Sequence, residues 1–132
     1  MREFDHERME VYRHALRFIR AANTIRPRFV SGRSALADQL DRASVSIALN
    51  IAEGAGEFAK REKARFYRIA RRSATECAAV LDIVRELELV EGDAIRECQD
   101  QLRLIVAMLI GLVKSLERSL LDPPQPKPEP QP

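Results

Sequence analysis

The chain has 132 residues, of which 45% are hydrophobic, 32% charged and only 5% aromatic, with no Trp. This length suffices for one domain with a real core, and the few aromatics predict an aliphatic core of Leu, Ile, Val and Ala. A formal net charge of +2 is too small to indicate nucleic-acid binding by itself.

Cysteine and histidine usage gives no sign of a disulfide framework or a metal site. Cys77 and Cys98 fit no Cys-x-x-Cys motif, and Cys77 lies among apolar positions, so we expect it to be a buried thiol. His6 and His14 lie eight residues apart with no matching carboxylates. We therefore expect no metal and no other cofactor. Reduced cysteines, and a start without an apolar run or export signal, favour the cytoplasm.

Two helices are predicted in the first half of the chain. The first runs from about Asp5 to Ile25 and ends before Pro27, which lacks an amide proton. The second begins at Ser34, which we expect to be its N-cap, and ends at Gly54 and Gly56. The apolar stripe of the first helix is Val11, Ala15, Phe18, Ala22 and Ile25; that of the second is Leu36, Leu40, Ala43, Ile47, Asn50 and Gly54.

Two longer helices follow, the third from about Lys60 to Leu89 and the fourth beginning after Gly92 and Asp93. One face of the third helix carries Phe66, Ile69, Ser73, Cys77, Val80 and Val84. The fourth repeats Ile95, Cys98, Leu102, Ile105, Leu109, Leu112, Leu116 and Leu120.

Four amphipathic helices with short connections predict an all-α, up-and-down antiparallel four-helix bundle over residues 1–121. Residues 122–132 hold six of the seven prolines and are predicted to form a disordered tail. Such a tail is either a ligand for an aromatic groove or a spacer.

The fourth helix is apolar in nearly every direction. Between Leu102 and Val113 its only charged residue is Arg103. The run is shorter than the roughly 20 residues that cross a bilayer, so we expect no membrane association. A single bundle buries one stripe of each helix, so we predict a homo-oligomer in which this helix also contacts a neighbouring subunit. The alternative is a loosely covered patch under the tail. The residues that cannot all face one interior are Leu104, Val106, Met108, Ile110 and Val113.

Polar residues lie close to the apolar stripes of the second and third helices. Asn50 falls on the core stripe, and a buried amide needs hydrogen-bond partners. We predict that Asn50 bonds across to Ser73 or Glu76 and sets the register of the two helices. No His or Lys base accompanies these residues, so we expect neither a catalytic site nor an enzyme.

A second face of the second helix carries Arg42, Ser46 and Glu53. Asp38 lies four residues before Arg42, a spacing that favours an ion pair within the helix. Two interpretations remain open: solvated pairs, or a subunit interface in which Arg42 and Glu53 pair across chains.

The charges form bands. Residues 60–72 carry seven Lys/Arg against one Asp/Glu, a net +6, and residues 73–101 carry two against eight, a net −6. Four arginines of the third helix, Arg61, Arg65, Arg68 and Arg72, lie within about 60° of one another, with Glu62 the only acid nearby. We predict nucleic-acid binding by this face; the alternatives are a solvated surface or docking on the acidic half of a neighbour, Glu86, Glu88, Glu91, Asp93 and Glu97. The predicted set is Arg61, Lys63, Arg65, Arg68, Arg71 and Arg72, widened by Lys60.

The densest motif is Ser-Ile-x-x-Asn-Ile-Ala-Glu-Gly over residues 46–54. It continues in Gln39-Leu40, Arg42-Ala43, Phe66, Ile69-Ala70-Arg71, Ser73 and Glu76. From about Phe4 to Leu121 the chain resembles the small four-helix bundle proteins first noticed in intervening sequences of 23S ribosomal RNA genes. The accessory subunit of diversity-generating retroelements is a relative of that family.

The resemblance implies a homopentamer, with five bundles around a central channel, and no enzyme activity. For the retroelement relatives it implies a basic surface that engages nucleic acid and a reverse transcriptase. The chain departs from the family pattern in three places. Ala48 replaces a frequent Pro, Asp41 stands beside Arg42 where an Arg pair is usual, and the proline-rich tail is additional.

The function predicted from the sequence is a non-enzymatic, cytoplasmic ring, most simply a pentamer, that offers a basic surface to RNA or DNA. In a retroelement this surface would carry template RNA to a reverse transcriptase. The alternative is a protein-protein scaffold that binds no nucleic acid.

Overall fold

A computed structural model describes residues 2–29 and 32–121. Its elements follow in the order η1 (Asp5–Arg8), α1 (Glu10–Ile25), η2 (Arg26–Arg28), α2 (Ser34–Gly56), α3 (Lys60–Glu86) and α4 (Gly92–Leu121). Over these residues there is no strand, and the predicted all-α fold is confirmed. The predicted tail, residues 122–132, lies outside the described part of the chain.

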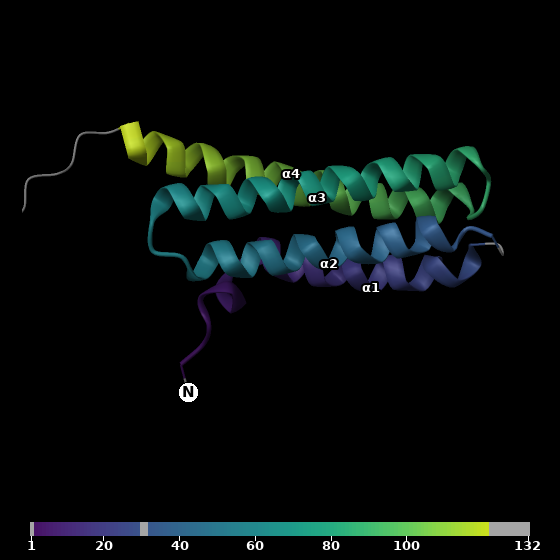
Figure 1. The fold of residues 1–132 in the computed structure, drawn as a ribbon, viewed down its shortest axis with the longest axis horizontal. Coiled ribbons are helices and arrows are strands. Elements are labelled where there is room, and N and C mark those ends of the chain that lie inside the picture. Colours follow the sequence, from purple (N-terminus) through teal and green to yellow (C-terminus); the bar gives the residue numbers. More distant parts are fainter. Residues whose placement is uncertain (1, 30–31, 122–132) are drawn as a thin grey trace, which may run out of the picture.

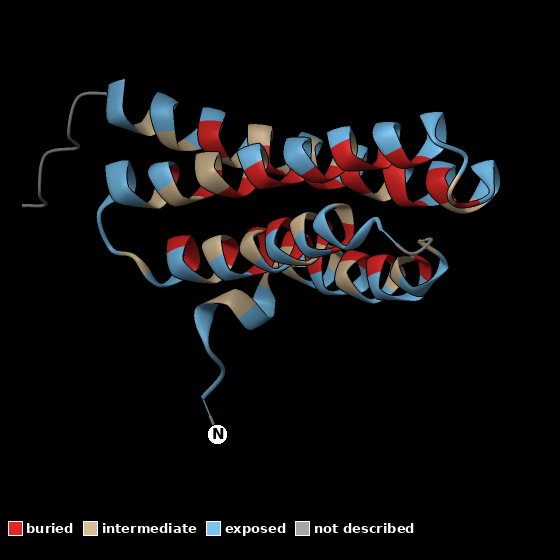
Figure 2. Cartoon of the chain, turned by 45° about the vertical axis from the view of Figure 1, so that its right-hand side comes forward, coloured by how far each residue is buried: buried red, intermediate tan, exposed pale blue. Residues whose placement is uncertain are grey.

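The four α-helices run up and down and form two layers (Figure 1), with α1 and α2 below α3 and α4 in that view. Each helix contacts its two neighbours in this arrangement. Buried residues line the inward faces of both layers, as Figure 2 shows in red. The largest fully buried side chains are aliphatic apart from Phe18 and Cys77, and they include Leu40, Ile47, Leu81, Leu102, Ile105 and Leu109.

The first helix is shorter than predicted. Its apolar stripe is buried throughout, but α1 begins at Glu10 and is preceded by a separate 3-10 turn. The Glu7 carboxylate accepts the Phe4 N–H at 3.2 Å, which closes that turn locally. Met9 then adopts an extended conformation, with φ −86° and ψ 124°, and this conformation interrupts the helix.

The third helix also ends earlier than predicted, at Glu86 rather than Leu89. Glu88 takes the left-handed conformation, with φ 54°, and the Leu89 N–H donates to the Val84 carbonyl at 3.1 Å. This is the 6→1 bond of a Schellman motif, with Glu88 in the place that glycine usually occupies.

The second helix begins without the predicted cap. Ser34 is the first helical residue rather than the N-cap; that position is Arg33, whose side chain makes no capping bond.

Close packing of α2 on α3 centres on Gly54 and Tyr67. A methyl group at Gly54 would lie 2.6 Å from Cε1 of Tyr67, well inside van der Waals contact. The Tyr67 ring is 2% exposed, and its hydroxyl donates to the Met9 sulfur at 3.6 Å, so the ring has little room to move. The buried face of α3 therefore passes through Tyr67 at this point, and Phe66, predicted to be a core residue, is only half-buried.

We predict that Gly54→Ala destabilises the protein by about 1–3 kcal/mol, because the added methyl overpacks the contact with Tyr67. Urea denaturation measures the change. Gly56→Ala is the matched control, since a methyl group there has no atom within 4 Å. Equal stability of the two variants would show that the α2–α3 contact is looser than described.

Candidate nucleic-acid interface

One polar link joins α2 to α3 and fixes how the outer face of α3 is presented. The hydroxyls of Ser46 and Ser73 lie 2.8 Å apart. Asn50 stays on its own helix, where its amide donates to the Ser46 carbonyl at 2.8 Å and to the Ser46 hydroxyl at 3.0 Å. The prediction that Asn50 bonds to Ser73 or Glu76 is therefore wrong. Asn50 is half-buried, and its short side chain reaches back one turn to Ser46. Ser46 then makes the hydrogen bond from α2 to α3.

Two more contacts set the register of the pair. Glu76 accepts a hydrogen bond from the Gln39 amide at 3.1 Å. Lys63 donates to the carbonyls of Gly54 and Ala55 at 2.7 and 3.0 Å. A cation at the carboxyl end of a helix satisfies its last carbonyls and opposes its dipole. Lys63, which was predicted to contact nucleic acid, instead caps the carboxyl end of α2.

The four predicted arginines occupy the outward side of α3 as a row, which we call the basic row: Arg61, Arg65, Arg68 and Arg72. Arg61 and Arg72 are exposed and form no ion pair with any described residue. The Arg65 guanidinium lies 3.2 Å from Glu62 and 4.9 Å from the centre of the Phe66 ring. Arg71, also predicted to bind, is half-buried beside the row.

An acidic residue of α4 enters this surface. Glu117 lies 3.0 Å from Arg68. The prediction that Glu62 is the only acid near the row is therefore wrong, because Glu117 comes from a helix about 50 residues further along the chain. Exposed pairs of this kind contribute about 0–1 kcal/mol, so a phosphate can displace them.

The outward face of α2 carries exposed apolar side chains between its charges. Val45 and Leu49 are 43% and 61% exposed, and Arg42 and Glu53 flank them. The predicted Asp38–Arg42 ion pair does not form; Asp38 lies 3.4 Å from Arg26 instead. Arg26 reaches Asp38 from the end of α1, where it also pairs with Asp41 at 2.5 Å.

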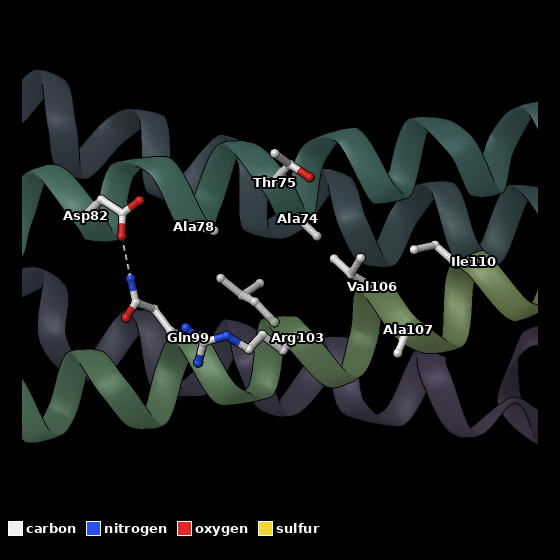
Figure 3. A pocket seen from close by; sticks show the side chains of 10 residues that line it. Ala74, Thr75, Ala78, Asp82, Gln99, Arg103, Val106, Ala107 and Ile110 are labelled. Carbon is white, nitrogen blue, oxygen red and sulfur yellow. Dashed lines mark hydrogen bonds between the residues drawn. The ribbon is translucent and has the colours of Figure 1, made fainter.

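The five apolar residues of α4 that were predicted not to fit into one interior are mostly not buried. Leu104 is 44% exposed, Met108 is half-buried, and only Val113 of the five predicted residues is buried. A groove of about 380 Å³ runs between α3 and α4. Figure 3 shows small side chains along it, and the Gln99 amide donating to Asp82 at 2.7 Å near one end. Its apolar lining includes Ala74, Ala78, Val106, Ala107 and Ile110.

Burial raises the pKa of both thiols. Cys77 and Cys98 are both buried. Burial, with a smaller effect of the Glu76 charge, raises the pKa of Cys77 to about 12, and burial with the Glu97 charge also raises the pKa of Cys98. Over residues 2–29 and 32–121, no group of three or more His, Cys, Asp or Glu side chains is placed to hold a metal ion. No described helix is long and apolar enough to span a bilayer.

We predict that Ser46→Ala and Ser73→Ala are not additive. Ser73→Ala should cost about 1 kcal/mol of stability, and Ser46→Ala at least as much, because it also loses the bond from Asn50. The double variant should recover about 0.5–1 kcal/mol of the sum, because the Ser46–Ser73 bond is lost in all three variants. Urea denaturation of the four proteins measures the coupling. Ser115→Ala, at an exposed position of α4, should leave stability unchanged. Additive losses would show that the two hydroxyls do not bond to each other.

Known proteins resemble this chain in sequence and in fold. The family model described as 23S rRNA-intervening sequence protein matches residues 7–111. No curated protein matches the chain. The crystal structure of a protein of unknown function from the S23 ribosomal protein family of Bacteroides thetaiotaomicron has a TM-score of 0.73. It is 20% identical over 79% of this chain and 98% of its own, a likeness that shows the fold alone. Because the family model spans residues 7–111, the chain belongs to the 23S rRNA-intervening sequence protein family.

Proposed function

We propose that this protein is a non-enzymatic, self-associating adaptor of the cytoplasm that binds nucleic acid through the basic row. The observation that carries the proposal is the state of Arg61 and Arg72: both are exposed, and neither has an ion-pair partner among the described residues. Guanidinium groups left free on a rigid helix are available to phosphates without breaking contacts that stabilise the fold.

The spacing of the row suits a chain of phosphates. Four arginines at successive helical turns extend over about 16 Å, since each residue rises 1.5 Å. Glu62 and Glu117 hold Arg65 and Arg68 in place in the free protein. The row is a convex helix face, so binding would follow charge and backbone rather than base sequence.

Self-association is the second part of the proposal. Exposed apolar residues occur on two surfaces, Val45 and Leu49 on α2 and Leu104 on α4. Burial of such patches against another copy removes apolar area from water, and Arg42 and Glu53 flank one of them as cross-chain ion-pair partners. A ring of five would bring several basic rows together, and in a retroelement it would deliver template RNA to a reverse transcriptase.

The alternative function is a scaffold without nucleic acid. Its support is the opposite end of the α3–α4 pair, where Glu86, Glu88 and Asp93 are all exposed. The basic row of one copy would then pair with this acidic end of the next, and the charge bands would build the assembly.

We predict that Arg61→Glu/Arg72→Glu lowers the affinity for a fluorescein-labelled single-stranded RNA at least tenfold at low salt, because attraction to phosphate becomes repulsion. Fluorescence anisotropy measures binding. Arg17→Glu/Arg20→Glu is the matched control, since both residues are exposed on α1 and the change in net charge is the same. It should bind within about threefold of the unmodified protein.

Sedimentation of the same samples separates the two functions. We expect the unmodified protein and the Arg61/Arg72 variant to share one mass, a multiple of the 15.0 kDa chain. Absence of RNA and DNA binding by the unmodified protein would favour the scaffold. A lower mass of the Arg61/Arg72 variant would place the basic row in a subunit contact. An equal loss of RNA affinity in the Arg61/Arg72 and Arg17/Arg20 variants would show that binding depends only on net charge.

A further inference from the structure

Phe58 is the most exposed large apolar side chain in the described part of the protein. Its exposure is 100%, so no other part of the described protein covers the ring. It lies in the short loop between α2 and α3, visible at the left end of the bundle in Figure 1. Three residues later the basic row begins at Arg61.

The structure shows why this ring has no partner. Phe58 directly precedes Ala59, the N-cap of α3. A hydrophobic residue at that position usually packs on the fourth residue of the helix. That residue is Lys63, whose ammonium group donates to the carboxyl end of α2. The nearest aromatic of α3, Phe66, is covered by the Arg65 guanidinium, 4.9 Å from its ring centre.

We propose that Phe58 is a stacking platform for an unpaired base, and that the nucleic acid held by the basic row is single-stranded. This inference rests on the proposed function. Single-strand sites combine a cationic track for the backbone with an aromatic face for bases, and stacking tolerates any base because every base has a π-face. In a duplex the base faces are already stacked on one another, so the ring would gain nothing except at an end.

The cationic residues that follow Phe58 along the chain favour a nucleic acid over a protein partner. A protein contact normally places its aromatic anchor in the middle of a closely packed apolar patch. Along the chain, no other large hydrophobic side chain from residue 50 to residue 65 is exposed. The exposed Leu120 and Leu121 lie at the same end of the bundle, where the Lys60 ammonium donates to the Ser119 hydroxyl. The exposed residues that follow the ring are Ala59, Lys60 and Arg61. The other strongly exposed ring, Phe4, stacks instead on His6, with ring centres 5.7 Å apart.

The absence of Trp from the sequence allows a direct test. Phe58→Trp introduces the only Trp of the chain at the proposed platform, and its fluorescence can be excited separately from that of the two tyrosines. Titration with a single-stranded oligouridylate should quench its fluorescence. A long RNA duplex at the same concentration of phosphates, in which almost every base face is already stacked, should quench it far less. Phe58→Ala should weaken oligouridylate binding about 5- to 150-fold, with binding of the long duplex unchanged. Phe4→Ala, the matched exposed ring, should leave both affinities unchanged.

The outcomes separate this inference from the function on which it rests. Oligouridylate binding that depends on Arg61 and Arg72 but is unchanged in Phe58→Ala, with no quenching, would overturn the inference and leave the adaptor function standing. Failure of the unmodified protein to bind either RNA would overturn both. A lower sedimentation mass of Phe58→Ala would overturn the inference by identifying the ring as a contact between subunits.

Discussion

The close contact between α2 and α3 is the constraint on which the rest of the structure depends. At its carboxyl end α2 approaches so closely that only a glycine fits at position 54 against the Tyr67 ring. The Lys63 side chain binds the carbonyls at the same end of α2, and the Ser46–Ser73 bond fixes the pair at a second level further along the helices. With α3 held on this side, its opposite face can only point outward, and that is the face that carries the basic row.

Burial and charge divide the protein between stability and the proposed binding. The core is aliphatic and closed, and the arginines of the row lie outside it, two of them with weak partners that a phosphate would replace. The same division leaves apolar surface of α4 outside the interior, because Leu104 is exposed and Met108 is only half-buried. The proposed self-association and the proposed binding therefore use different surfaces.

The helices and most of the core could be predicted from the sequence because apolar spacing is a local property. The five stripe residues of α1 are all buried, and the α4 stripe is buried as far as Leu109. Contacts between helices could not be predicted in the same way. Periodicity placed Asn50 on the core stripe, but Asn50 is half-buried, and only the packed pair shows that Ser46 makes the bond to α3.

Other errors have the same origin. The approach of Glu117 to Arg68 depends on where a distant helix lies. The role of Lys63 depends on the path of the α2–α3 loop, and so does the exposure of Phe58. The sequence held one signal for the exposure of Phe58. A hydrophobic residue just before a helix usually packs on the fourth residue of that helix, and here the fourth residue is a lysine.

The salt dependence of RNA binding by the unmodified protein tests the central claim most directly. If the four arginines of the basic row replace counterions on a single strand, the logarithm of the binding constant should fall against the logarithm of salt concentration with a slope of about −3. A slope near zero, with binding retained at high salt, would contradict the claim that phosphates on the basic row carry the affinity.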